Sequence, residues 1–586
     1  MLDELGLIGN CQCSALVHRS GEIVWACMPR FDSPPVFGRL LDPAGGGFAI
    51  TPAGGENGTL RYLPNTNVLE TRFETKDGAF RILDFAPRFI QWDRSYRPTM
   101  LVRVVEPLSG APRVKVSCKP VLGWSKRQPE RQWGSHHIAF TGYPSHVRLT
   151  TDAPLEYIDG EPFALGQRRC FVLSWGPPVE EPLEDLCDRY LRQTVRYWET
   201  WVKHCDVPPI YQEEVIRSAL ALKLHCYEDT GAIVAALTTS LPEAPGTGRT
   251  WDYRYCWLRD AYYTLGAFRL LGHFDEREQF SQYLLNVASS AKDFELAPLY
   301  RVDGKGDLTE HVLTNWEGYQ GNGPVRVGNQ AAEHRQNDVF GEMVLALSPI
   351  FLDARFRDSV SQPVLDLMSA LAKKAEKVAG EPDAGIWEYR EQWRPQTFTT
   401  LMCWAAADRM ARVAARHRPQ DAAGHLAAAN RVRELLLAKA VHPTRNCLVA
   451  DFGGTEVDAA LLQAVTLRLL EPSDPRMKAT VDAVQADLGL SGWLRRYRVA
   501  DDFGVPTAAF MICNFWLVEA LVLTGRVDEG RALMRAVQSV RAPLGLLSED
   551  VDPKSGVMWG NFPQAYSHGG VIHAAFAAAP RWTDVA

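Results

Sequence analysis

The sequence changes character at Val172-Leu173-Ser174-Trp175-Gly176-Pro177-Pro178. Before this stretch, short runs rich in β-branched and aromatic side chains are separated by Gly and Pro, a pattern typical of strands in an antiparallel sheet. After it, apolar residues recur with the spacing of helices. The two prolines therefore mark the predicted change from a β domain to an α domain.

The clearest strand pair lies before this point. Residues 68–74 and 79–85 read as strands on either side of Lys76-Asp77-Gly78, and an Asp-Gly pair between such runs is a strong hairpin signal. Residues 100–105 and 113–118 repeat the strand pattern. Several strands at such short spacing predict an antiparallel β-sandwich.

Helical patterns dominate the second part of the chain. Residues 183–201 are charged and amphipathic, which predicts a helix that connects the two parts. In residues 364–375 the apolar side chains fall on one helical face, with Pro363 before the run and Gly380 beyond its end, both typical of helix boundaries. Residues 515–521 are apolar nearly all round, which predicts a buried helix.

The number of helices indicates the architecture. At about 30 residues for a helix and its connection, about 350 residues hold about a dozen helices, which suits a double-ring α-barrel. The expected fold class is multidomain β + α. We predict a β-sandwich over residues 1–180, a helical linker over 181–208 and an α-barrel over 209–586.

The composition excludes several classes of partner. Of the 586 residues, 63 are Lys or Arg and 70 are Asp or Glu, a formal net charge of −7. With no basic block in the sequence we expect no nucleic-acid partner. No run approaches the roughly 18–20 apolar residues that span a bilayer, so we expect no membrane partner. Two acids near the N-terminus, where a secretory signal is basic, favour a cytoplasmic location.

Neither a metal nor a cofactor is expected. The 12 cysteines are scattered and lack the spacing of a zinc site. The more informative residues are aromatic and charged ones that gather in predicted loops, at 250–260, 385–390 and 547–552, in a chain with 17 tryptophans. Sugar rings pack against aromatic faces while their hydroxyls accept and donate charged hydrogen bonds. These loops therefore indicate a carbohydrate site.

The same loops carry a family resemblance. The segments Leu7–Cys11, Pro29–Pro34, Trp251–Asp260, Gly385–Glu388 and Gly560–His568 occur in the order seen in glycoside hydrolase family 15, and the chain resembles this family of inverting α-glucosidases over almost its whole length. The resemblance implies an N-terminal antiparallel β-sandwich, a helical linker and an (α/α)6 barrel. That architecture agrees with the pattern of strands and helices.

The resemblance also implies the site residues. Inversion needs a carboxylic acid to protonate the departing oxygen and a carboxylate, about 6.5–9.5 Å away, to activate water. By resemblance Glu388 is the general acid and Glu549 the general base, while Arg259 and Asp260 bind the terminal glucose. Four aromatic residues are candidates for the substrate-binding walls: Trp251, Tyr253, Trp257 and Trp387.

Two expectations concern the surroundings of these groups. Poor solvation beside aromatic rings should raise the pKa of the Glu388 carboxyl, whereas Glu549 should be wetter and ionised. Nearby Asp550 and Asp552 could be mistaken for the base. The segment 334–338 opens a predicted helix, and its role could equally be loop anchoring or sugar contact.

Two segments depart from the family's pattern. Residues 503–510 lack a carboxylate that many bacterial members carry, which would alter the acceptor side around Pro506-Thr507-Ala508. Gly569 and Gly570 stand where a bulkier residue is common, which would loosen the floor of the pocket. The catalytic pair is unaffected by either departure.

The predicted function is an exo-acting, anomer-inverting α-glucoside hydrolase that releases β-glucose from the non-reducing end of a small α-glucoside. Trehalose and isomalto- or malto-oligosaccharides each present a terminal α-glucosyl unit, and we expect trehalose first, with isomaltose or maltose close behind. An inverting α-glucoside phosphorylase and a non-catalytic sugar-binding protein are the alternatives. A homodimer is also an open alternative.

Overall fold

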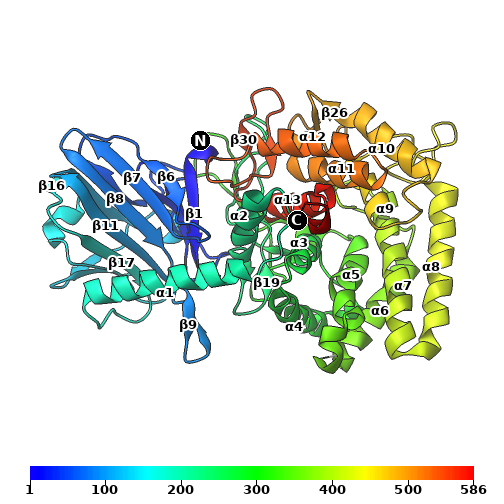
Figure 1. Cartoon of the computed structure of the whole chain (residues 1–586), viewed down its shortest axis with the longest axis horizontal. Helices are drawn as coiled ribbons and strands as arrows, with labels where there is room; N and C mark the ends of the chain where they lie inside the picture. The colour runs from blue at the N-terminus through cyan, green and yellow to red at the C-terminus, as the bar shows by residue number, and fades with distance from the viewer. Residues whose placement is uncertain (360, 586) are drawn as a thin grey trace.

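Two antiparallel sheets form the N-terminal part of the computed structural model, which describes residues 1–359 and 361–585 (Figure 1). The first sheet has the order β1-β2-β3-β5-β12-β16 with β4 beside β3, and the second has the order β13-β14-β15-β17-β11-β8-β7-β6. The strands of the first sheet are β1 (Leu5–Gly9), β2 (Ser14–His18), β3 (Glu22–Cys27), β4 (Pro35–Phe37), β5 (Gly47–Pro52), β12 (Arg113–Lys119) and β16 (Phe163–Ala164). Those of the second are β6 (Thr59–Tyr62), β7 (Leu69–Thr75), β8 (Gly78–Phe85), β11 (Met100–Gly110), β13 (Arg131–Trp133), β14 (His137–Phe140), β15 (Val147–Thr151) and β17 (Arg169–Trp175).

The predicted hairpin is confirmed. Strands β7 and β8 pair from Leu69 opposite Asp84 to Thr75 opposite Gly78, so a two-residue turn joins them. Gly78 has a φ of +140°, and a Cβ there would lie 2.1 Å from the Ser109 carbonyl oxygen. A glycine is therefore required where the hairpin meets the end of β11.

A buried ion pair joins the two sheets. Arg103 on β11 lies opposite Asp84 on β8 and donates to its Oδ1 at 2.7 Å, and both side chains are fully buried. The same guanidinium donates to the carbonyl oxygens of Phe48 at 2.6 Å and Gly21 at 2.7 Å, which belong to the first sheet and its adjoining turn. One side chain thus satisfies acceptors from both layers of the sandwich.

We expect Arg103→Leu to destabilise the chain by about 3–5 kcal/mol, because it leaves a buried carboxylate without a partner. The double variant Arg103→Leu/Asp84→Leu should recover part of that loss, since both charges are then absent. Urea unfolding of the three proteins measures the difference. A double variant no more stable than the single one would show that the buried charge is not the cause.

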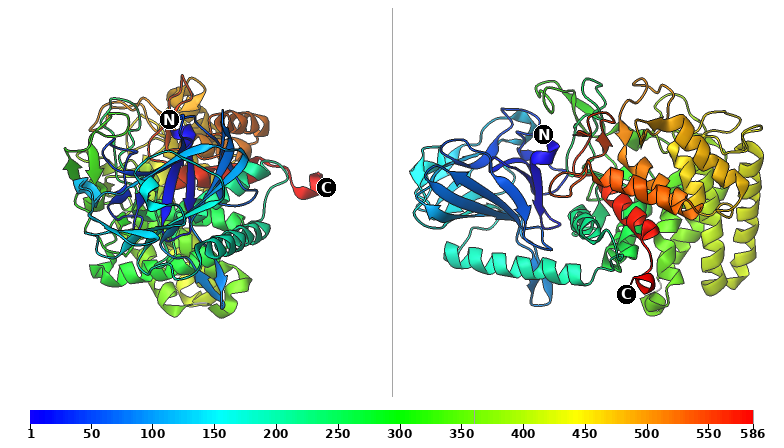
Figure 2. Two further views of the ribbon diagram at one scale, coloured as in Figure 1. Left: turned by 90° about the vertical axis from the view of Figure 1, so that its left-hand side faces the viewer. Right: turned by 45° about the horizontal axis from the view of Figure 1, so that its top comes forward.

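Helix α1 (Leu183–Lys203) follows the sandwich, as predicted. It lies along the sandwich and leads to the helical part, as both Figure 1 and Figure 2 show. Its buried residues Leu186 and Tyr190 pack with Val102 and Val172 of the second sheet. We propose that the chain divides into a sandwich (1–180), a helical linker (181–208) and a barrel (209–586).

The helices after α1 form a closed double ring. The outer helices are α2 (Gln212–Lys223), α4 (Asp275–Ser290), α6 (Gln362–Val378), α8 (Pro419–Lys439), α10 (Pro475–Leu488) and α12 (Val527–Gln538). The inner helices are α3 (Leu258–Leu270), α5 (Asp338–Leu352), α7 (Thr397–His417), α9 (Gln463–Thr466), α11 (Met511–Leu523) and α13 (Ala565–Ala578). Each inner helix packs on the next, and α13 packs on α3, which closes the ring. The predicted fold class is confirmed.

The burial of individual helices follows the predicted patterns. Helix α6 buries Val364, Leu367, Met368 and Leu371 along one face, whereas almost every residue of α11 is buried. An inner helix is surrounded by neighbours and must be apolar all round, while an outer helix needs a single apolar stripe. In the described part of the chain, no helix is both long and apolar enough to cross a membrane.

The expectation that Gly569 and Gly570 loosen the pocket floor is wrong. A Cβ at Gly570 would lie 2.4 Å from the ring of Phe515, and one at Gly569 would lie 3.2 Å from Tyr263. These glycines let α13 approach α11 and α3 closely. They tighten the inner ring rather than open it.

Short strand pairs lie in the loops. They are β9 (Phe89–Gln91) with β10 (Arg94–Tyr96), β18 (Cys226–Tyr227) with β19 (Ala232–Ile233), β20 (Cys256–Trp257) with β21 (Leu299–Tyr300), β22 (His311–Leu313) with β23 (Val325–Val327), β24 (Pro382–Asp383) with β25 (Arg394–Pro395), β26 (Gly489–Leu490) with β27 (Trp493–Leu494), and β28 (Ala509–Phe510) with β29 (Asp550–Val551) and β30 (Met558–Trp559). All but the first pair belong to the helical part. They shape the loops that precede the inner helices.

The sandwich supports one of these loops directly. The buried Arg254 pairs with Asp252 at 2.6 Å and donates to the Ser33 carbonyl oxygen at 2.7 Å. Trp25 of β3 donates from Nε1 to the Leu237 carbonyl oxygen at 2.8 Å. The segment between β19 and α3 is therefore held against the sandwich.

Candidate active site

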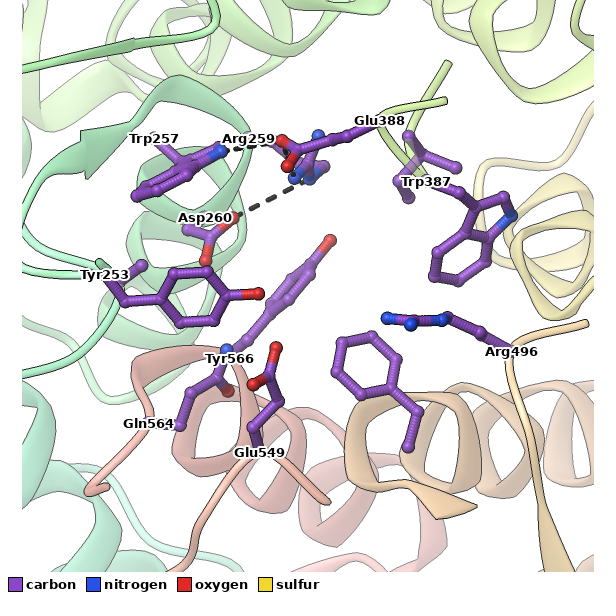
Figure 3. A pocket seen from close by; sticks show the side chains of 13 residues that line it. Tyr253, Trp257, Arg259, Asp260, Trp387, Glu388, Arg496, Glu549, Gln564 and Tyr566 are labelled. Atoms are coloured by element: carbon purple, nitrogen blue, oxygen red, sulfur yellow. Dashed lines mark hydrogen bonds and ion pairs between the residues drawn. The ribbon is translucent and has the colours of Figure 1, made fainter. Parts of the chain in front are cut away.

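A cavity of about 510 Å³ lies at the ends where several inner helices begin (Figure 3). Trp257 and Phe510 are the N-cap residues of α3 and α11, and the Gln564 side chain caps α13. The cavity is lined by Ala235, Tyr253, Trp257, Arg259, Asp260, Ile386, Trp387, Glu388, Arg496, Phe510, Glu549, Gln564 and Tyr566.

Glu388 is held through one of its two carboxylate oxygens. Oε1 accepts hydrogen bonds from Trp257 Nε1 at 2.8 Å, from the Arg259 guanidinium at 3.2 Å and from Gln336 Nε2 at 3.2 Å. Among the described residues, Oε2 has no such donor, and the carboxyl lines the cavity. One oxygen thus fixes the orientation while the other is available to a ligand.

The backbone at Glu388 is strained. Its φ is +61°, in the left-handed region that non-glycine residues adopt rarely and at a cost of about 1–2 kcal/mol. The turn is closed by hydrogen bonds from Glu388 N to the Gly385 carbonyl oxygen at 3.1 Å and from Tyr389 N to that of Ala384 at 3.1 Å. Such strain, maintained by the surrounding structure, is typical of functional positions.

Glu549 enters the cavity from the other side, between α11 and α13. Its N–H donates to the Asn561 carbonyl oxygen at 3.2 Å, and its own carbonyl oxygen accepts from Met511 N at 2.9 Å. The residue is only 1% exposed, and its Oε2 is buried without a hydrogen-bond partner among the described residues. A Cβ at Gly560 would lie 3.0 Å from that oxygen, so Gly560 keeps the space behind the carboxylate.

The structure separates Glu549 from the two neighbouring acids. Asp552 is directed to its own turn, where its Oδ1 accepts from Lys554 N at 2.9 Å and Ser555 N at 2.7 Å. Asp550 is buried and does not line the cavity. Of the three, Glu549 alone lines the pocket.

The expected difference in pKa between the two glutamates is wrong for the ligand-free chain. Burial raises the pKa of Glu388, but the positive charge of Arg259 and the hydrogen bonds from Trp257 and Gln336 outweigh it, so the pKa ends below its ordinary value. Burial and the charge of Glu243 raise the pKa of Glu549 to about 8. Glu388 is the more ionised of the two because it has donors that Glu549 lacks.

Arg259 and Asp260 both line the cavity, from the first turn of α3. Arg259 donates to Gln336 Oε1 at 3.0 Å as well as to Glu388, and its Nε lies 3.7 Å from Asp260 Oδ1. Burial raises the pKa of Asp260 to about 6, against the opposing effect of Arg259. The pair therefore orients Glu388 in addition to facing the pocket.

The aromatic candidates have different surroundings. Tyr253, Trp257 and Trp387 line the cavity, and Trp387 is fixed by a hydrogen bond from Nε1 to Asp458 Oδ2 at 2.8 Å. Trp251 lies outside it, in an adjoining compartment of about 520 Å³. The guanidinium carbons of Arg326 and Arg390 lie 5.3 and 5.1 Å from the centre of its ring, so part of the ring is covered within the chain itself.

Several lining residues were not found from the sequence. Gln564 and Tyr566 lie within the segment Gly560–His568, whose resemblance to the family could have indicated them. Arg496, which pairs with Glu243 at 2.6 Å, lies in a segment without a recognisable pattern. Gln336 falls in the stretch 334–338, for which anchoring and ligand contact were both left open.

Two carboxylates, an Arg–Asp pair and aromatic walls meet at one end of a double-ring α-barrel, a combination that suits a glycoside hydrolase. Comparison with known families identifies which one. The model of glycosyl hydrolases family 15 matches residues 209–576, and that of the trehalase-like N-terminal domain matches residues 1–145. The chain belongs to glycosyl hydrolase family 15.

Curated relatives match the chain over nearly its full length. A trehalase of Mycolicibacterium smegmatis is 33% identical over 97% of this chain and 90% of its own length. A trehalase of Thermoplasma volcanium is 32% identical over 97% of this chain and 92% of its own. A bacterial glucoamylase solved in complex with acarbose superposes with a TM-score of 0.67, covering 99% of this chain and 94% of its own, at 14% identity. That last likeness supports the fold alone.

Proposed function

We propose that this glycoside hydrolase removes one glucose unit, with inversion of the anomeric carbon, from the non-reducing end of a small α-glucoside, trehalose foremost. The observation that carries the proposal is the pairing of Glu388 and Glu549 in one cavity, each brought there by a different loop between helices. The full-length trehalase relatives support an α-glucoside as the substrate and trehalose as the first to test.

In this proposal Glu388 protonates the departing oxygen and Glu549 activates water. Binding of substrate shifts both pKa values towards these roles. The glycosidic oxygen accepts a hydrogen bond only from protonated Glu388, and the sugar excludes water from it, so its pKa rises. A water that donates to Glu549 stabilises the carboxylate and lowers the pKa of that group. Both shifts oppose the ligand-free order of the two pKa values.

The loops around the adjoining compartment support exo action on short substrates. Arg249 pairs with Asp501 and donates to the Gly504 carbonyl oxygen at 2.7 Å, and Arg390 N donates to Asp502 Oδ2 at 2.8 Å. These contacts tie together loops from three separate parts of the sequence. We expect a wall of linked loops to admit a chain end or a disaccharide rather than the middle of a polymer.

The residues 503–510, which lack the family's usual carboxylate, belong to this wall. Phe503 lines the adjoining compartment and packs edge-on against Trp251, with 4.9 Å between the centres of the two rings. Asp501 and Asp502 line the same compartment. The proposed acceptor side therefore has carboxylates, which come from Asp501 and Asp502, just before the segment 503–510.

The test is hydrolysis of trehalose, isomaltose and maltose, followed by proton NMR of the first product. We expect β-glucose to appear first, because water attacks the face opposite the departing oxygen. Initial release of α-glucose would contradict inversion. Release of glucose 1-phosphate only when phosphate is supplied would identify a phosphorylase instead, and binding without turnover would identify a sugar-binding protein.

A further inference from the structure

Two compartments of similar size meet at Glu388. The inner one is the cavity of about 510 Å³ already described, and the outer one, of about 520 Å³, shares Tyr253, Trp387, Glu388 and Arg496 with it. A ligand that fills both must pass the carboxyl of Glu388. If the inner compartment binds the glucosyl unit, as the proposed function holds, the outer compartment receives the leaving group.

His334 stands out among the residues that line only the outer compartment. It follows the short helix of residues 330–333 and precedes α5, and it is only 9% exposed. Both ring nitrogens are buried, and neither has a hydrogen-bond partner in the described part of the chain. Buried polar atoms are nearly always paired, so a side chain with two unpaired nitrogens indicates a ligand or an ordered water.

The surroundings of His334 fix its chemistry. Burial lowers the pKa of the imidazole, against the opposing charge of Glu388, so the ring is neutral near neutral pH. A neutral imidazole offers one donor and one acceptor. Charges of both signs, Arg390 and Asp502, line the same compartment. A donor, an acceptor and charges of both signs suit a ligand with several adjacent hydroxyl groups, because each hydroxyl both donates and accepts. They suit a single ion less well.

We infer that His334 hydrogen-bonds the hydroxyls of the leaving sugar in the outer compartment and so selects substrates whose leaving group is itself a sugar. The inference rests on the proposed function and identifies a specificity-determining residue for it. Under this inference both roles considered for residues 334–338, loop anchoring and sugar contact, are filled by different residues. Gln336 supports Glu388, whereas His334 serves the ligand.

The test compares substrates with and without a leaving sugar. α-Glucosyl fluoride fills the inner compartment, but its leaving group is too small to reach His334. We expect His334→Ala to lower kcat/KM for the disaccharide that the wild type hydrolyses best by about 10- to 100-fold, mainly through KM. Hydrolysis of α-glucosyl fluoride should change less than about twofold. His334→Gln, which keeps a donor and an acceptor, should recover part of the disaccharide activity.

His425→Ala is the matched control. His425 lies on α8, is 6% exposed, and burial lowers its pKa as it does that of His334. In His425→Ala, the ratio of disaccharide hydrolysis to α-glucosyl fluoride hydrolysis should stay at the wild-type value. Equal losses on both substrates in His334→Ala, or no loss on the disaccharide, would overturn the inference. A wild-type chain that hydrolyses neither substrate would instead overturn the proposed function.

Discussion

Glu388→Gln lowers kcat for the preferred disaccharide by about 10²- to 10⁴-fold, because the departing sugar oxygen then leaves without a proton. The amide can still accept from Trp257 and Arg259, so the fold and the pocket should be retained. Steady-state kinetics on trehalose, isomaltose and maltose measures the loss. Glu391→Gln, an exposed position three residues away, should remain within about twofold of wild type.

α-Glucosyl fluoride separates the two proposed roles. Fluoride departs with little help from an acid, so Glu388→Gln should lose much less activity on this substrate than on a disaccharide. A variant that lacks the base loses both activities, since water must be activated in either reaction. If Glu549→Gln instead kept its activity on α-glucosyl fluoride and Glu388→Gln lost it, Glu549 would be the acid and Glu388 the base. The ligand-free pKa values of the two groups would agree with that exchange.

Glu549→Gln lowers turnover of both substrates by about 10²- to 10⁴-fold and stabilises the folded chain. The second effect follows from burial. The pKa of Glu549 is raised to about 8 in the folded chain, against about 4.3 in an unfolded one. Folding therefore favours the neutral carboxyl, and stability is lost as the pH rises from about 4.3 towards 8. A glutamine cannot ionise and avoids this loss.

The melting temperature, measured between about pH 5 and pH 8, tests the second effect. The advantage of Glu549→Gln over wild type should be small at the acidic end and should grow towards the alkaline end. Asp550→Asn is the matched control, because Asp550 is also buried and its pKa is also raised by burial and by the charge of Glu549. This control should gain stability while losing less than about tenfold in turnover. A Glu549→Gln variant that is less stable than wild type at every pH would contradict the account.

The fold was largely predictable, for a local reason. The Asp-Gly turn, the apolar stripe of α6 and the apolar surface of α11 are short-range patterns, and each predicts its element without knowledge of the rest of the chain. Their number and order then indicate a sandwich and a double ring. The glycines of α13 were misinterpreted because their value depends on Phe515 and Tyr263, which come from other helices.

The sequence predicted which residues form the site, but it did not predict the pKa values of the two glutamates. The motifs named Glu388, Glu549, Arg259 and Asp260, and the structure brings all four to one cavity. The pKa of Glu388 depends on Trp257, Arg259 and Gln336, which converge on one oxygen from segments up to 131 residues away. That convergence leaves no local pattern in the sequence.

By itself the sequence determined the two-part architecture, the family and the four polar residues Glu388, Glu549, Arg259 and Asp260 of the pocket, because strand and helix periods and short motifs depend on neighbouring positions. Only the tertiary structure decided which carboxylate has several hydrogen-bond donors, which tryptophan lies under guanidinium groups and which buried histidine has no hydrogen-bond partner among the described residues. These properties arise from desolvation and from contacts between distant segments, and both depend on how the chain closes around the pocket.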